Sequence, residues 1–170
     1  MIYYGFATLH WRAAGLSGPL IGALWAEGVI AEVVLFAFGR RVVARLGPRR
    51  LLAIAGAAGV LRWSVLGLTS DPWAVAAVQL LHAATFGATH LGAMHFISAA
   101  APAGLSARAQ ALYASVTVGL APGLAMLAAG GLYQAMAGQA FLVMGGVAGI
   151  GWALSFALPA TDNTQSEAAS

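Results

Sequence analysis

The feature that most constrains this chain is a set of five continuous apolar stretches, each long enough to form a helix across a bilayer. Such a helix needs about 20 residues to cross about 30 Å of hydrocarbon. The strands of a membrane barrel alternate apolar and polar residues over about ten positions, and these stretches do not alternate. The sequence therefore predicts an all-α integral membrane protein whose five complete spans are Leu20–Gly39, Leu51–Thr69, Trp73–Ala99, Ala109–Met136 and Ala140–Leu158.

Composition supports a membrane location and excludes several classes of protein. Of the 170 residues, 61% are hydrophobic and 8% are charged, whereas about a quarter of a soluble domain is charged. The net charge is +3, but the basic residues are all Arg and cluster beside apolar runs, so we expect no nucleic-acid partner. The chain has no Cys, and it lacks phosphate-loop, nucleophile-elbow, zinc-protease and dinucleotide motifs. We therefore expect neither an enzyme nor a bound cofactor.

The two ends of the chain differ from the five spans. Residues 1–9 are apolar and aromatic but too short to cross a bilayer, and they lack the basic start and cleavage site of a signal peptide. They predict a partial helix that ends near Trp11 and Arg12. Residues 160–170 are polar and predict a disordered tail. We expect one transmembrane helical domain over residues 1–159, with its first helix truncated.

The positions of the Arg residues predict how the helices are oriented. Five of them lie between the first two complete spans, and Arg108 lies two loops later on the same side. The loops on the other side contain only Arg12 and Asp71 as charged residues. Because cytoplasmic loops retain positive charge, we expect the loop over residues 40–50 and the C-terminal tail to be cytoplasmic. The five residues of this topology or gating loop are Arg40, Arg41, Arg45, Arg49 and Arg50.

Polar side chains on the third span mark a candidate site. At 100° per residue, Gln79, His82, Phe86 and His90 fall on one face of this helix, which we expect to line a cavity in a substrate or proton pathway. The alternative is a structural role, in which the two His residues form hydrogen bonds across helices. Two His residues on two separate turns, without Cys, are a weak ligand set, so we predict no metal site.

The first two complete spans contain three ionisable residues, Glu27, Glu32 and Arg62. A charged group at the centre of a bilayer is costly, so we expect each of them to face water or a partner. Helix rise puts Arg62 and Glu27 at similar depth, with Glu32 about one turn nearer the cytoplasm. We expect Arg62 to form an ion pair with one of the two Glu residues, with anion binding by Arg62 as the alternative. The other Glu residue is then a candidate protonatable group.

Short groups of residues along the chain form a recognisable set. They are Tyr3-Tyr4-Gly5-Phe6, Trp11, Ala31-Glu32-Val33, Arg62-Trp63, Gln79, Leu81-His82, Thr85-Phe86, His90-Leu91 and Leu132-Tyr133-Gln134. As a set, they resemble the C-terminal half of a major facilitator superfamily transporter of the bacterial 3-phenylpropionate permease group. The basic loop is similar to the superfamily's Gly and Arg gating motif but lacks its acidic residue. Glu27 stands where these permeases have an apolar residue.

The resemblance implies helices seven to twelve of a twelve-helix transporter in the bacterial inner membrane, with Met1 inside the seventh helix. It implies proton-coupled transport of a small organic acid, in particular an aromatic one, bound by Arg62, His82 and His90 with Phe86. Since only one half is present, we expect the chain to be incompetent alone and to require the N-terminal half or a second protomer. A truncated gene product and a genuine short protein both fit. A second class stays open, namely a non-transporting scaffold or sensor module in which the intramembrane polar residues are structural.

Overall fold

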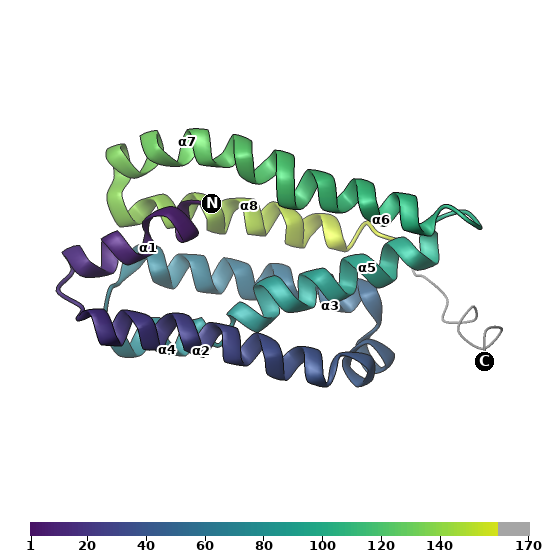
Figure 1. The fold of residues 1–170 in the computed structure, drawn as a ribbon, viewed down its shortest axis with the longest axis horizontal. Helices are drawn as coiled ribbons and strands as arrows, with labels where there is room; N and C mark the ends of the chain where they lie inside the picture. Colours follow the sequence, from purple (N-terminus) through teal and green to yellow (C-terminus); the bar gives the residue numbers. More distant parts are fainter. Residues whose placement is uncertain (160–170) are drawn as a thin grey trace.

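The computed structural model describes residues 1–159, and within this range the chain is a bundle of helices without strands (Figure 1). The predicted disordered tail lies outside the described residues. The first three helices are α1 (Ile2–Ala13), α2 (Gly18–Ala37) and α3 (Gly39–Leu68). The next span consists of α4 (Pro72–Gln79), the π-helix η1 (Ala83–Ala88) and α5 (Thr89–Ala100). The last two passes are α6 (Ser106–Ala114), the π-helix η2 (Ser115–Leu120) and α7 (Ala121–Met136), and then α8 (Ala140–Ser155).

The described helices provide five membrane passes. Helices α2 and α3 and the continuous runs Pro72–Ala100 and Ser106–Ser155 are each long and apolar enough to span a bilayer. The last run reverses at a 3₁₀ turn, where Ala137 has a φ of 48°, so α7 and α8 run antiparallel (Figure 1). Together with the shorter α1, these passes confirm the predicted five complete spans and the partial first helix. The chain is therefore an all-α, multi-pass membrane protein.

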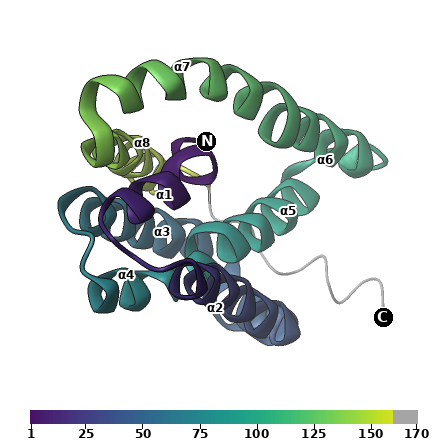
Figure 2. The same ribbon diagram turned by 60° about the vertical axis from the view of Figure 1, so that its left-hand side comes forward.

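The distribution of apolar side chains is that of a protein dissolved in lipid. Large apolar residues face outward, and Trp73 and Leu127 are each 83% exposed. The main cluster of buried side chains lies around Tyr3, Trp11 and Phe141, which α1 and α8 contribute. Helix α1 contacts α2, α7 and α8 and lies among them (Figure 2), and its Tyr3 is 1% exposed. The partial first helix is consequently part of the interior.

Glycine residues allow α3 and α8 to pack closely. A Cβ atom at Gly56 would lie 2.7 Å from Cα of Trp152, and one at Gly67 would lie 2.8 Å from the Leu142 side chain. Small residues at such positions let helix backbones approach within a membrane, where helix packing depends on close van der Waals contact. The contact between α3 and α8 fixes the middle of α3 in the bundle. This part of α3 contains the buried Arg62.

Two π-turns interrupt the later spans. The η2 turn ends just before Pro122, which has no N–H group to donate to the carbonyl of Val118, so the regular α-helical bonding cannot continue there. The η1 turn lies in the middle of the third complete span. A π-turn closes with i→i+5 hydrogen bonds and therefore rotates every later side chain relative to an ideal α-helix. This rotation decides which residues of α5 face the interior.

The basic segment between α2 and the membrane part of α3 is helical, so the predicted loop over residues 40–50 is wrong. Helix α3 begins at Gly39 and is kinked at Gly47, whose φ is +70°. Pro48 then begins the membrane part of the helix, because proline is well tolerated in a first turn. Val43 and Leu46 pack against a cluster of buried residues formed by Leu51, Ala55 and Ala88. Apolar residues on one face and Arg on the other thus make this segment an amphipathic helix rather than a loop.

Candidate functional site

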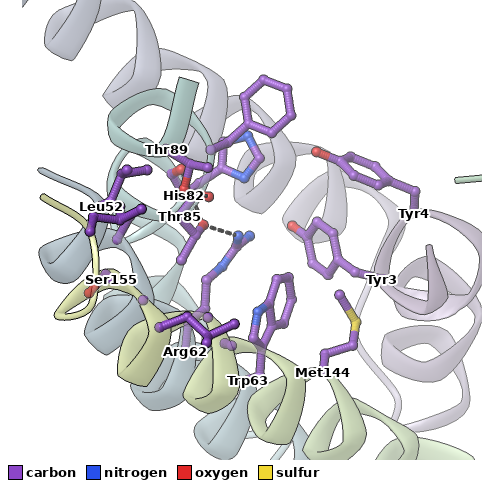
Figure 3. Close-up of a pocket in the computed structure, with 18 residues that line it drawn as sticks. Tyr3, Tyr4, Leu52, Arg62, Trp63, His82, Thr85, Thr89, Met144 and Ser155 are labelled. Carbon is purple, nitrogen blue, oxygen red and sulfur yellow. Dashed lines mark hydrogen bonds between the residues drawn. The ribbon is translucent and has the colours of Figure 1, made fainter. Parts of the chain in front are cut away.

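A cavity of about 400 Å³ lies between α1, α3, the η1 region and α8, and we call it the central cavity (Figure 3). Its volume is in the range of small-molecule sites. Apolar and aromatic side chains form most of its wall, and one guanidinium group points into it. The residues that line it include Tyr3, Tyr4, Arg62, Trp63, His82, Thr85, Phe86, Thr89 and Met144.

Arg62 is the cationic group of the central cavity, and only 1% of it is exposed. Its Nη1 donates to Oγ1 of Thr85 and its Nη2 donates to Oε1 of Gln79, each at 2.9 Å. The rings of Tyr3 and Trp63 each lie with their centroids 4.6 Å from Cζ of Arg62, which is cation–π distance. Dipoles and ring faces therefore stabilise the guanidinium.

The predicted ion pair between Arg62 and a Glu residue is wrong for the part of the chain that the structure describes. Within residues 1–159, no carboxylate oxygen lies within 4.0 Å of the Arg62 guanidinium. Glu32 turns instead to His82, and Glu27 lies on another face of α2, in a separate groove beside Leu80. A similar depth along the helix axes does not bring Glu27 and Arg62 together, because the two side chains face different directions.

Gln79 takes the place of the predicted carboxylate partner. It is fully buried at the end of α4. Its Nε2 donates to the hydroxyl of Tyr3 at 2.8 Å and to the carbonyl of Leu24 at 2.9 Å, and its Oε1 accepts from Arg62. One amide thus connects α1, α2 and α3 to the third span.

His82 and Glu32 form the second polar pair of the site. Nε2 of His82 lies 3.3 Å from Oε2 of Glu32, and the imidazole stacks on Phe86 with ring centroids 5.8 Å apart. Gly28 makes room for this arrangement, because a Cβ atom there would lie 3.3 Å from Cβ of His82. A smaller cavity of about 190 Å³ contains Glu32 and shares His82 and Phe86 with the central cavity. The pair therefore lies beside the Arg62 site.

Two of the predicted site residues lie elsewhere. His90 is exposed on α5 with its ring 6.2 Å from that of Phe36, and it lines neither the central nor the smaller cavity. The helical-wheel argument assumed 100° per residue, whereas the η1 turn rotates α5 so that Thr89 lines the cavity instead. Glu27 is separate from the site, as described above. Gln79, His82, Phe86, Arg62 and Glu32 do come together.

Sequence reasoning assigned no site role to three contributors, Tyr3, Trp63 and Thr85, although all three are among the residues that carry the family resemblance. Neutral hydroxyl and aromatic groups cost little in a membrane, so composition within a span does not single them out. One signal was available for Thr85, because it lies three residues after His82 and residues three apart share a helix face. Tyr3 is among the residues that carry the family resemblance, but its role in the site depends on a partner 76 residues away, Gln79.

Among residues 1–159, five membrane passes enclose a buried cation beside an aromatic cavity, and buried ionisable groups in membrane spans mark functional sites such as substrate pathways. Comparison with family models matches residues 1–143 to the MFS_1 like family, a family of major facilitator superfamily transporters. The chain belongs to this family, and it is accordingly a non-enzymatic membrane protein.

Two relatives illustrate the relationship. The chain is 40% identical over 147 residues to the "Probable 3-phenylpropionic acid transporter" of Escherichia coli (strain K12), a match that covers 86% of this chain and 38% of that protein. It is 23% identical over 129 residues to the "Uncharacterized transporter YwbF" of Bacillus subtilis (strain 168), a match that covers 76% of this chain and 32% of that protein. The matches thus span about a third of the length of these relatives. No solved structure matches it.

Proposed function

We propose that this chain is the C-terminal part of a proton-coupled transporter for a small organic acid, in particular an aromatic carboxylate, which binds in the central cavity. The observation that carries this proposal is a buried guanidinium that has only neutral partners among residues 1–159. The name of the Escherichia coli relative, which refers to 3-phenylpropionic acid, supports the choice of an aromatic acid as the substrate class.

Arg62 is the carboxylate-binding group in this proposal. A guanidinium has five N–H donors in a planar fork that matches a carboxylate, and the described contacts of Arg62 use two of them. Its buried Nε has no hydrogen-bond partner among the described residues. The aromatic walls formed by Tyr4, Trp63 and Phe86 suit the ring of an aromatic acid. A ligand carboxylate would therefore neutralise the cation while its ring fills the apolar part of the cavity.

The Glu32–His82 pair is the proposed proton carrier. A neutral imidazole that donates from Nε2 to Glu32 leaves Nδ1 as an acceptor, and Nδ1 of His82 is buried without a partner among the described residues. A proton that arrives at Nδ1 produces an imidazolium, which the Glu32 carboxylate stabilises. Because His82 also lines the central cavity, its charge state acts directly on an anion bound beside Arg62.

Transport by alternating access requires a second helical unit. Transporters of this kind bind substrate between two halves and rock one half against the other. We propose that an N-terminal half or a second protomer completes the cavity, and that this chain alone does not transport. We also propose that the protein lies in the bacterial inner membrane, with Arg40, Arg41, Arg45, Arg49 and Arg50 on the cytoplasmic side.

A non-transporting scaffold is the second candidate, and the hydrogen bonds that join Gln79 to Tyr3 and Leu24 favour it. These contacts link three helices and would exist in a purely structural module. Such a module predicts that substitutions at Gln79 or His82 change assembly but never the flux of a solute.

Uptake of labelled 3-phenylpropionate into sealed vesicles containing the complete transporter tests the proposal. We expect uptake that increases when the outside is acidic, and that an Arg62→Met variant abolishes. The matched control is Arg108→Gln, which changes an exposed Arg that does not line the cavity. Uptake equal to that of vesicles without the protein would refute the transport proposal, and uptake indifferent to the pH gradient would refute its proton coupling.

A further inference from the structure

Gln79 is buried behind Arg62 and does not line the central cavity. Any effect it has on a ligand is therefore exerted through the cavity residues that it contacts, Arg62 at 2.9 Å and Tyr3 at 2.8 Å. Its exposed fraction is zero, and a buried polar side chain in a membrane protein is expensive unless its hydrogen bonds are made.

The chemistry of its partners determines which way the amide points. The carbonyl of Leu24 can only accept, so Nε2 must face it, and the guanidinium of Arg62 can only donate, so Oε1 must face it. The hydroxyl of Tyr3 lies 2.8 Å from Nε2 and 3.0 Å from Oε1. Both amide hydrogens and the amide oxygen are thus engaged, and this network keeps Arg62 in one orientation.

An amide in this position orients Arg62 without neutralising it. A Glu side chain has the same length and would also accept from Nη2, but it would cancel the charge of the guanidinium. Among residues 1–159, the carboxylate that belongs to the site is Glu32, and it contacts His82 rather than Arg62. The positive charge of Arg62 therefore stays available to whatever enters the central cavity.

From these contacts we infer that Gln79 is the positioning residue that sets the charge selectivity of the central cavity. By holding Arg62 with a neutral group, it makes the cavity prefer an anion to an uncharged molecule of the same shape. This inference rests on the proposed function, in which Arg62 binds the carboxylate of the substrate.

The test compares two ligands that differ in charge but hardly in shape, 3-phenylpropionate and 3-phenylpropanamide. Binding to the purified complete transporter in lipid nanodiscs is measured for the wild type, Gln79→Glu and Gln79→Met. Hydrogen bonds to charged groups are worth enough that the wild type should prefer the acid by at least about tenfold. Gln79→Glu should remove this preference for the acid, because the introduced carboxylate forms an ion pair with the Arg62 guanidinium. Gln79→Met should lower thermal stability but keep the preference, because it breaks the network without adding charge.

Each outcome separates the inference from the proposed function. A Gln79→Glu variant that still prefers the acid overturns the inference. The proposed function is tested separately with Arg62→Met: if this variant loses the preference for the acid, the proposed function stands even when the inference about Gln79 fails. If Gln79→Glu and Gln79→Met lose the preference for the acid equally, the inference is also overturned. A displaced Arg62 side chain would then explain the loss without any effect of charge. A wild type without any preference refutes the proposed function itself. If Gln79→Met does not fold, Gln79→Asn replaces it, because the shorter amide disturbs the same network without adding charge.

Discussion

Replacement of Arg62 by Met separates the binding role of this residue from a structural one. The change removes two hydrogen bonds from a charged donor, each worth about 1.5–3 kcal/mol. It also removes the contacts with the rings of Tyr3 and Trp63, worth about 1–2 kcal/mol each when desolvated. Against these losses, the variant no longer has to keep an ion out of water, which costs several kcal/mol. The gain offsets only part of these losses, so we expect the free energy of unfolding to fall by a few kcal/mol.

Ligand binding should respond very differently. Without the guanidinium, a carboxylate would be buried with no cation, so we expect affinity for 3-phenylpropionate to fall at least about tenfold. Thermal unfolding and ligand titration on the same nanodisc preparation measure both quantities. Arg62→Lys is the matched control, because it keeps the charge but loses the planar fork, and it should retain part of the affinity. A large loss of stability with unchanged affinity would refute the reasoning.

Three further predictions concern the proton carrier, the helix packing and the second π-turn. Glu32→Gln removes the carboxylate beside His82, so in sealed vesicles uptake should no longer respond to a pH gradient; a preserved response would rule out this pair as the proton carrier. Gly56→Ala places a methyl group against the Trp152 backbone and should lower the free energy of unfolding by about 1–3 kcal/mol, whereas Gly146→Ala, which faces open space, should be neutral in the same denaturation assay. Pro122→Ala restores a backbone donor, so amide hydrogen exchange over residues 115–122 should slow if the proline causes the π-turn, and unchanged exchange would contradict that cause.

The spans were predictable because the signal for a membrane helix is local. Each span must satisfy its own backbone hydrogen bonds and present about 20 apolar residues to lipid, whatever its neighbours are. The prediction of a loop over residues 40–50 was wrong because a local pattern of apolar residues in this segment was not taken into account. The Arg residues predict only the membrane side of this connection, whereas the apolar residues Val43 and Leu46 between them pack against a buried cluster, which favours a helix.

Part of the candidate site was predictable because ionisable groups are costly in a span. That cost singled out Glu32, Arg62 and His82, and the structure places all three around adjoining cavities. It also singled out His90, which the η1 turn rotates away from them. Their roles in substrate binding and proton movement stay predictions.

By itself, the sequence determined that this chain is a multi-pass helical membrane protein and which of its polar residues require a partner, because both follow from the cost of leaving polar groups in hydrocarbon. Only the tertiary structure decided the partners. Arg62 meets the neutral Gln79 and the hydroxyl of Thr85 rather than Glu27, since the rotation and packing of separate helices set which side chains come within bonding distance.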